Sequence, residues 1–65
     1  MRYVGLTDNP ERRKKEYGSP SDFRVEREFT SEDAARIWEK GMIARGCEGD
    51  TGGAGWRYGY TFSVT

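Results

Sequence analysis

The sequence contains no histidine and a single cysteine, Cys47, among its 65 residues. An intrachain disulfide is therefore excluded, and so are zinc sites of the four-ligand kind, which need cysteine and histidine. Cys47 has no histidine to activate it, so we expect an inert thiol. No apolar run approaches the length of a signal h-region or a membrane span. These absences predict no membrane partner and a cytoplasmic location.

Net charge is also absent, because eleven basic residues balance eleven acidic ones. Bulk electrostatics therefore provide no general attraction to nucleic acid or to a membrane. The charges are segregated, since residues 2–15 are mainly basic and residues 16–33 mainly acidic. Two Trp, four Tyr and three Phe supply large rings for a core. We expect one ordered domain over residues 1–65, near the lower size limit for folding without disulfides or metal.

A strand followed by a capped helix is predicted at the start of the chain. Residues 2–6 (RYVGL) are rich in β-forming residues and alternate as a strand. Asn9 offers a side-chain oxygen to the free amides of a helix start, and Pro10 suits the first helical position. The helix is predicted over residues 10–17, and its charged sequence provides almost no apolar face.

A second strand and a second helix are predicted in the middle of the chain. Residues 23–29 alternate as a charged edge strand, and one side of it is predicted to carry Phe23, Val25, Arg27 and Phe29. Thr30, with Asp33 three residues on, resembles a capping box that opens a helix over residues 31–45. Apolar residues at spacings of three and four predict the stripe that packs on the sheet, namely Ala34, Ile37, Trp38, Gly41 and Met42.

The last segment carries the strongest strand signal. Residues 56–64 alternate, which predicts a central strand whose core side holds Trp56, Tyr58, Tyr60, Phe62 and Val64. Residues 46–55 contain five glycines and indicate a mobile connection, with a phosphate cradle as the alternative interpretation. The elements together predict an α+β domain with two helices and a small three-stranded, mainly antiparallel sheet in the order β-α-β-α-β.

Two stretches resemble the GIY-YIG endonuclease superfamily. The letters YVG at residues 3–5, followed by NPERR at residues 9–13 and by Tyr17, resemble the second half of the family signature. The stretch AARIWEKGMIARG at residues 34–46 is similar to the family helix that carries the metal-binding glutamate, here Glu39. The resemblance implies a GIY-YIG-like fold, nucleic acid as the partner, DNA above all, and phosphodiester hydrolysis with Mg²⁺ or Mn²⁺ if the domain is catalytic.

The resemblance also assigns a role to each matching residue. Tyr3 would lie near the attacking water, Arg13 would stabilise charge on the phosphate, Tyr17 would assist as the helix phenol, and Glu39 would hold the metal. Such a set could serve phosphodiester hydrolysis, which needs a cation, a metal and a proton acceptor. The rest of the basic run is expected to help in binding nucleic acid, through Arg12, Lys14 and Lys15.

The first signature strand of the family, with its own tyrosine, is missing from the start of this chain. Our hypothesis is that the C-terminal strand takes its place, as in a circular permutation, with Tyr58 or Tyr60 as the missing tyrosine. This hypothesis requires the last strand to lie beside Tyr3 and not at a distant edge of the sheet.

Every candidate has an ordinary structural alternative. The basic run is also typical of a solvated helix face, Tyr3 of a core aromatic residue, and Glu39 of an exposed partner for Arg36 or Arg45. Two alternatives stand for the function. One is a catalytically inactive DNA-binding or protein-interaction module of the same fold. The other is a homodimer in which the aromatic strand pairs across an interface.

Overall fold

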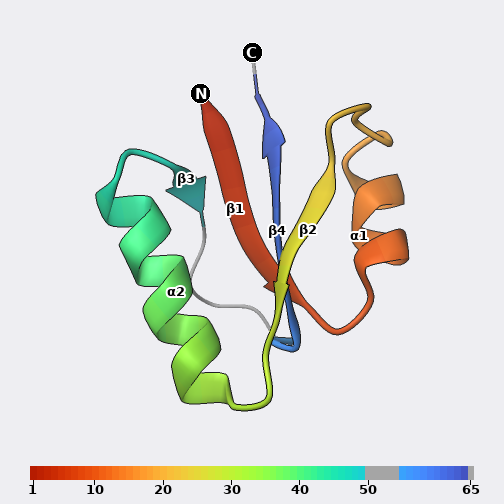
Figure 1. The fold of residues 1–65 in the computed structure, drawn as a ribbon. Helices are drawn as coiled ribbons and strands as arrows, with labels where there is room; N and C mark the ends of the chain where they lie inside the picture. Colours follow the sequence, from red (N-terminus) through yellow and green to blue (C-terminus); the bar gives the residue numbers. More distant parts are fainter. Residues whose placement is uncertain (50–54, 65) are drawn as a thin grey trace.

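The computed structural model describes residues 1–49 and 55–64. Its elements are β1 (Arg2–Thr7), α1 (Pro10–Glu16), β2 (Arg24–Glu28), α2 (Glu32–Ala44), β3 (Glu48–Gly49) and β4 (Tyr58–Ser63). The strands form one mixed sheet in the order β2-β4-β1-β3 (Figure 1). Within the described residues, neither helix is long and apolar enough to cross a membrane.

The predicted α+β class is confirmed, but the predicted three-stranded, mainly antiparallel sheet is wrong. The additional strand is β3, which has two residues and pairs in parallel with β1, so that the sheet is mixed. A strand this short shows no alternation, and the sequence around it is rich in glycine. Local pattern could therefore not reveal it.

β4 is a central strand, as predicted, because it pairs antiparallel with β1 on one side and with β2 on the other. Tyr3 lies opposite Phe62, and Gly5 lies opposite Tyr60. The C-terminal strand therefore lies directly beside Tyr3, as the circular-permutation hypothesis requires. Since both edges of β4 are paired within the chain, this strand is not available for the pairing across a dimer interface that we had considered.

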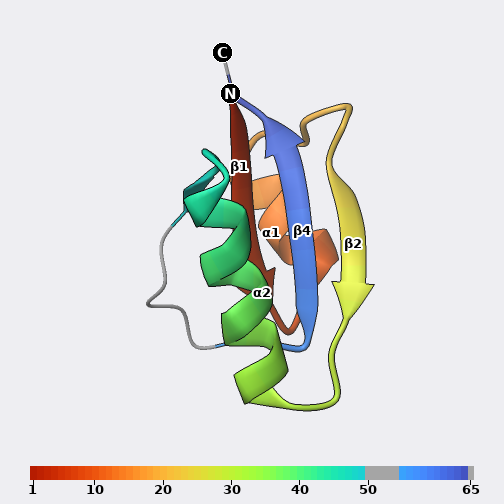
Figure 2. The ribbon, with the colours of Figure 1, turned by 60° about the vertical axis from the view of Figure 1, so that its left-hand side comes forward.

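The two helices lie on opposite faces of the sheet (Figures 1 and 2). The face toward α2 is identified by Gly59, where an added Cβ would collide with the ring of Trp38. Val4 belongs to this face and is fully buried. The face toward α1 is aromatic and includes Tyr60 and Phe62, which are 2% and 4% exposed. The sheet thus separates two cores of different character.

β2 contains a β-bulge that changes which side chains share a face. Val25 lies opposite Tyr60, whereas Arg27 lies opposite Gly59, and the register shifts between these two positions. Since neighbouring residues of β4 point to opposite faces, Val25 and Arg27 do so too. The prediction that they share one side is wrong, because a bulge inserts one residue that alternation cannot show.

The two phenylalanines that flank β2 also separate. Phe23 stacks on Tyr60, with ring centroids 4.9 Å apart, on the α1 face. Phe29 packs against Trp38 at 5.6 Å on the α2 face. Their predicted common side is therefore wrong for the same reason, and each phenylalanine contributes to a different core.

The predicted cap of α1 is correct, and the predicted cap of α2 is off by one residue. The side chain of Asn9 accepts a hydrogen bond from the amide of Arg12 at 3.1 Å, which confirms the predicted start of α1. In α2 the cap is Ser31 and not Thr30, because the hydroxyl of Ser31 accepts from the amide of Ala34 at 3.2 Å. Either hydroxyl residue could have served by sequence, so the error is a single position.

α2 turns a different side to the sheet from the one that the sequence predicts. Its buried residues are Ala35 and Glu39, with half-buried Trp38 beside them, whereas Ile37 is 72% exposed. The helix is therefore rotated by about one residue, or roughly 100°, from the predicted orientation. The hydrophobic pattern predicts that Ile37 is buried and Glu39 is not, whereas in the structure Glu39 is buried and Ile37 is exposed.

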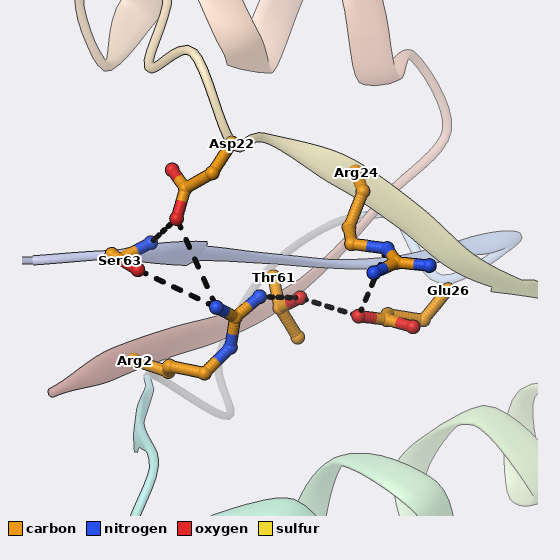
Figure 3. A network of polar contacts seen from close by, with 6 residues as sticks. All are labelled: Arg2, Asp22, Arg24, Glu26, Thr61 and Ser63. Carbon is orange, nitrogen blue, oxygen red and sulfur yellow. Dashed lines mark hydrogen bonds and ion pairs between the residues drawn. The ribbon is translucent and has the colours of Figure 1, made fainter.

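A polar network connects β1, β2 and β4 on the α2 face of the sheet (Figure 3). The hydroxyl of Thr61, fully buried, accepts from Arg2 at 2.7 Å and donates to Glu26 at 2.7 Å. The carboxylate of Asp22 accepts from the Ser63 amide at 2.8 Å and lies 3.8 Å from the Arg2 guanidinium. The hydrogen bonds from Ser63 hold the pKa of Asp22 below its ordinary value.

Candidate functional site

Three tyrosines meet on the α1 face of the sheet, and we call Tyr3, Tyr17 and Tyr60 the tyrosine cluster. The rings of Tyr3 and Tyr17 have centroids 5.5 Å apart, and those of Tyr17 and Tyr60 are 6.1 Å apart. The hydroxyl of Tyr60 donates a hydrogen bond to that of Tyr17 at 3.3 Å. The structure therefore brings together three of the predicted site residues, one each from β1, the end of α1 and β4.

Exposure differs sharply within the tyrosine cluster. Tyr60 is buried, Tyr3 is half-buried and Tyr17 is 36% exposed. Tyr17 is the C-cap of α1, so the helix end holds its ring over the sheet while one side of the ring stays in solvent. A ligand could reach Tyr17 and Tyr3 without unfolding the cluster.

Tyr60 is held as a neutral phenol. Burial raises its pKa well above the ordinary value of 10.0, and the hydrogen bond with Tyr17 raises it further. A phenol in this state can donate a hydrogen bond, but it is a weak acid and, while protonated, a poor proton acceptor at neutral pH. Tyr60 therefore does not resemble a general base for an attacking water.

Arg13 lies at the rim of the tyrosine cluster. Its positive charge favours the ionised form of Tyr60, and so it partly offsets the increase in the pKa of Tyr60 that burial causes. Its NH1 is 3.1 Å from the carboxylate of Glu16, while its Nε is buried without a hydrogen-bond partner among the described residues. Arg12 shares the same carboxylate at 3.6 Å. A phosphate that approached Arg13 would therefore compete with Glu16 for the guanidinium.

The remaining basic residues of α1 point into solvent. Every residue of this helix, which lies wholly within the described part of the chain, is exposed or half-buried. Lys14 and Lys15 are exposed and form no ion pair within residues 1–49 and 55–64. Both predicted interpretations, a solvated helix face and a phosphate contact surface, place these side chains in water.

Glu39 does not join the tyrosine cluster. It is 1% exposed, belongs to α2 on the opposite face of the sheet, and lies 3.6 Å from NH1 of Arg36. The structure therefore does not bring Glu39 together with Tyr3 and Arg13, because the sheet separates the two helices. The alternative of an exposed partner for Arg36 is wrong in its exposure, although the pairing with Arg36 is present.

The metal that the resemblance implies does not fit beside the tyrosine cluster with Glu39 as its ligand. Among the described residues, groups of three or more Asp, Glu, His or Cys side chains that could hold a metal ion are absent. Binding of Mg²⁺ or Mn²⁺ by Glu39 stays a prediction, and it would have to occur on the α2 face, away from Arg13.

Of the two candidates for the missing family tyrosine, only Tyr60 lies in the cluster. Tyr58 pairs with Thr7 and Glu28 near the other end of β1, two residues away along β4. Phe62 was not predicted as a site residue, although the predicted core side of the last strand includes it, and it is a buried neighbour of the cluster. Its ring lies 5.4 Å from that of Tyr3 and 4.8 Å from that of Tyr17.

The glycine-rich segment bears only partly on the site. Within residues 46–55, the structure describes residues 46–49 and 55. Residues 48–49 form β3. The phosphate-cradle interpretation depends on residues 50–54, which lie outside the described residues. After the gap, the carboxylate of Asp8 accepts from the amides of Trp56 at 3.3 Å and Arg57 at 3.4 Å, which fixes the entry into β4.

Comparisons with known proteins match this chain to no family model, to no curated protein and to no solved structure. The GIY-YIG resemblance therefore stays a prediction that depends on residues 3–5, 9–13 and 34–46 and on Tyr17.

Proposed function

We propose that this chain is a GIY-YIG-like domain that binds DNA through α1 and the tyrosine cluster and does not cleave it. One observation carries the proposal. Arg13 lies beside the partly exposed rings of the cluster, while Glu39, the expected metal ligand, is buried on the other face of the sheet. The residues that could bind DNA therefore lie together, whereas the expected metal ligand, which cleavage would need, is not among them.

The chemistry of the surface favours a single strand. Cationic side chains contact phosphates, and exposed aromatic rings stack on bases that are not already paired. Tyr17, a residue that is 36% exposed, lies next to the four cations of α1, Arg12, Arg13, Lys14 and Lys15. Because the whole chain has no net charge, attraction must be local, and binding is expected to be modest and sensitive to salt.

A metal-dependent endonuclease is the second candidate, and the position of β4 favours it. β4 lies antiparallel to β1, and Tyr60 lies opposite Gly5. The circular-permutation hypothesis requires a tyrosine of the last strand beside the strand that carries Tyr3. This candidate would need metal ligands other than Glu39 near the cluster, and a tyrosine more easily deprotonated than Tyr60. Both requirements weigh against it.

The binding proposal is tested by fluorescence anisotropy with labelled single-stranded and duplex DNA over a range of salt concentrations. We expect single-stranded DNA to bind more tightly than duplex. Arg13→Gln should reduce the slope of log affinity against log salt by about 1. Tyr17→Ala should weaken single-strand binding by about 1–3 kcal/mol through lost stacking. Lys40→Gln, at an exposed position of α2, is the matched control because it also removes one positive charge, and it should leave both quantities unchanged.

The catalytic candidate is tested in parallel. Plasmid and single-stranded DNA are incubated with the protein and Mg²⁺ or Mn²⁺, beside Arg13→Gln and Glu39→Gln, with circular dichroism to verify that each variant is folded. We expect no cleavage by any of the three proteins. Metal-dependent cleavage that is lost in folded Arg13→Gln would replace the proposal by the endonuclease. Absence of DNA binding at low salt would refute both.

A further inference from the structure

A groove lies between β2 and α2, on the face of the sheet away from the tyrosine cluster. Its volume is about 270 Å³, and we call it the α2 groove, lined by Arg27, Ile37, Trp38, Gly41, Met42 and Arg45. This volume suits one or two side chains better than an extended ligand, since pockets for whole small molecules are usually larger.

Gly41 is an unusual residue for its position. It lies in the interior of α2, where glycine costs about 1 kcal/mol of helix stability relative to alanine. Packing does not explain it, because among the described residues no heavy atom beyond the helix's own nearby backbone lies within 4 Å of an added Cβ. What the missing side chain does provide is room, since Gly41 lines the α2 groove.

The lining of the groove includes three large apolar side chains, Ile37, Trp38 and Met42. Trp38 and Met42 are half-buried, while Ile37 is 72% exposed at the rim. Ile37, which the predicted orientation turns to the sheet, lies at the exposed rim, while Trp38 still packs against Gly59 and Phe29 of the sheet side and also lines the groove. An exposed isoleucine beside a half-buried tryptophan and methionine offers an apolar side chain a contact within the groove.

Two arginines flank this apolar surface without a charged partner. Neither Arg27 nor Arg45 forms a side-chain hydrogen bond or an ion pair within the described part of the chain. Arg27 reaches the groove because the bulge in β2 turns it to the α2 face, opposite Gly59. Bulges commonly redirect one side chain toward a functional site.

We propose that the α2 groove binds an acidic peptide segment of a partner protein. A large apolar side chain of the segment enters the pocket over Trp38 and Met42, and carboxylates on either side of it pair with Arg27 and Arg45. Charge complementarity selects an acidic occupant. The small volume of the groove and the aliphatic groups of Ile37 and Met42 suit one apolar side chain of such a segment. The site is separate from the DNA-binding surface and does not depend on it.

The test uses the full chain and a set of short labelled peptides, each with one large apolar residue between glutamates. A second set has glutamine in place of glutamate, and a third has alanine in place of the apolar residue. We expect at least one acidic peptide with an apolar residue to bind in fluorescence anisotropy, and its two matched peptides to bind about tenfold more weakly. Binding should also weaken as salt is added.

Variants of the protein locate the site. Gly41→Leu should fill the groove and weaken peptide binding about tenfold, whereas the matched Gly41→Ala should stabilise α2 and retain most of the affinity. Arg27→Gln combined with Arg45→Gln should abolish the preference for glutamate over glutamine peptides. Urea unfolding of each variant verifies that the fold is intact.

Three outcomes would overturn this proposal. The first is that no peptide of the acidic set binds, and the second is that Gly41→Leu binds as tightly as the original protein. The third is that single-stranded DNA binds more weakly to Gly41→Leu, which would assign the groove to nucleic acid. Loss of DNA binding in Arg13→Gln concerns the other face, so the failure of either proposal can be distinguished from the failure of the other.

Discussion

At the scale of the residue, the aromatic core depends on a missing side chain. Gly5 lies opposite Tyr60, and an added Cβ would collide with the hydroxyl and ring of that phenol. Tyr60 in turn reaches Tyr17 with its hydroxyl. The glycine of the YVG stretch thus has a steric explanation in this chain, namely that it makes room for the tyrosine of β4.

Gly5→Ala is therefore expected to destabilise the protein. Overpacking of this kind costs about 1–3 kcal/mol in the free energy of unfolding, measured by urea denaturation. Combined with Tyr60→Phe, which removes the colliding hydroxyl, the loss should be smaller than the sum of the two single losses. Gly41→Ala, in open space, serves as the control. Strict additivity of the two substitutions would contradict the contact.

The raised pKa of Tyr60 predicts how stability changes at high pH. Below pH 10 the phenol is protonated in both states, so the stability due to its burial is fully present. Above about pH 10 the unfolded chain loses this proton and the folded chain keeps it, so stability falls, by up to about 1.4 kcal/mol per pH unit. Urea unfolding at several pH values from neutral to above 10 measures the decline, which should be smaller in Tyr60→Phe. Equal declines in both proteins would contradict the assignment.

At the scale of the element, local sequence signals predict where helices and strands form, whereas long-range contacts determine which side each element turns to the core. The start of α1 was predictable because Asn9 and Pro10 act within a few residues of each other. The central place of β4 was predictable because its aromatic alternation spans the whole strand. The bulge in β2 and the orientation of α2 were not predictable, since both depend on which partner each strand and helix meets.

Thr61 is expected to hold three strands together through its hydroxyl. Thr61→Val keeps the shape but leaves the groups of Arg2 and Glu26 without this bridge, so we expect a loss of about 1–3 kcal/mol in the free energy of unfolding. Ser63→Ala is the matched control, because it removes an exposed hydroxyl of the same network and should cost less than about 0.5 kcal/mol. Similar losses in both variants, measured in urea, would show that the bridge contributes little.

At the scale of the whole molecule, the sheet separates two surfaces of different chemistry. One carries the tyrosine cluster with Arg13, and the other carries the α2 groove with its two arginines. Glu39 belongs to the second side, which is why a site that combines it with the tyrosines could not form.

Because the two surfaces share no residue, we expect their variants to act independently. Arg13→Gln should leave the affinity for the acidic peptide unchanged, and Gly41→Leu should leave the affinity for single-stranded DNA unchanged. The double variant should show both losses at their single-variant size. Titration of each ligand in the presence of the other, by anisotropy, gives the coupling directly. A change of more than about threefold would indicate communication through the sheet.

By itself, the sequence determined the order of the main elements, the cap of α1 and the aromatic character of the central strand, because these depend on neighbours a few positions apart. The tertiary structure decided which residues face each other across the sheet. A bulge of one residue sends Arg27 to the side of α2, and a rotation of one residue buries Glu39 in place of Ile37. Successive side chains point to opposite faces in a strand and are about 100° apart around a helix. A shift of one residue therefore changes which side chains face the core, and the sequence pattern does not reveal such a shift.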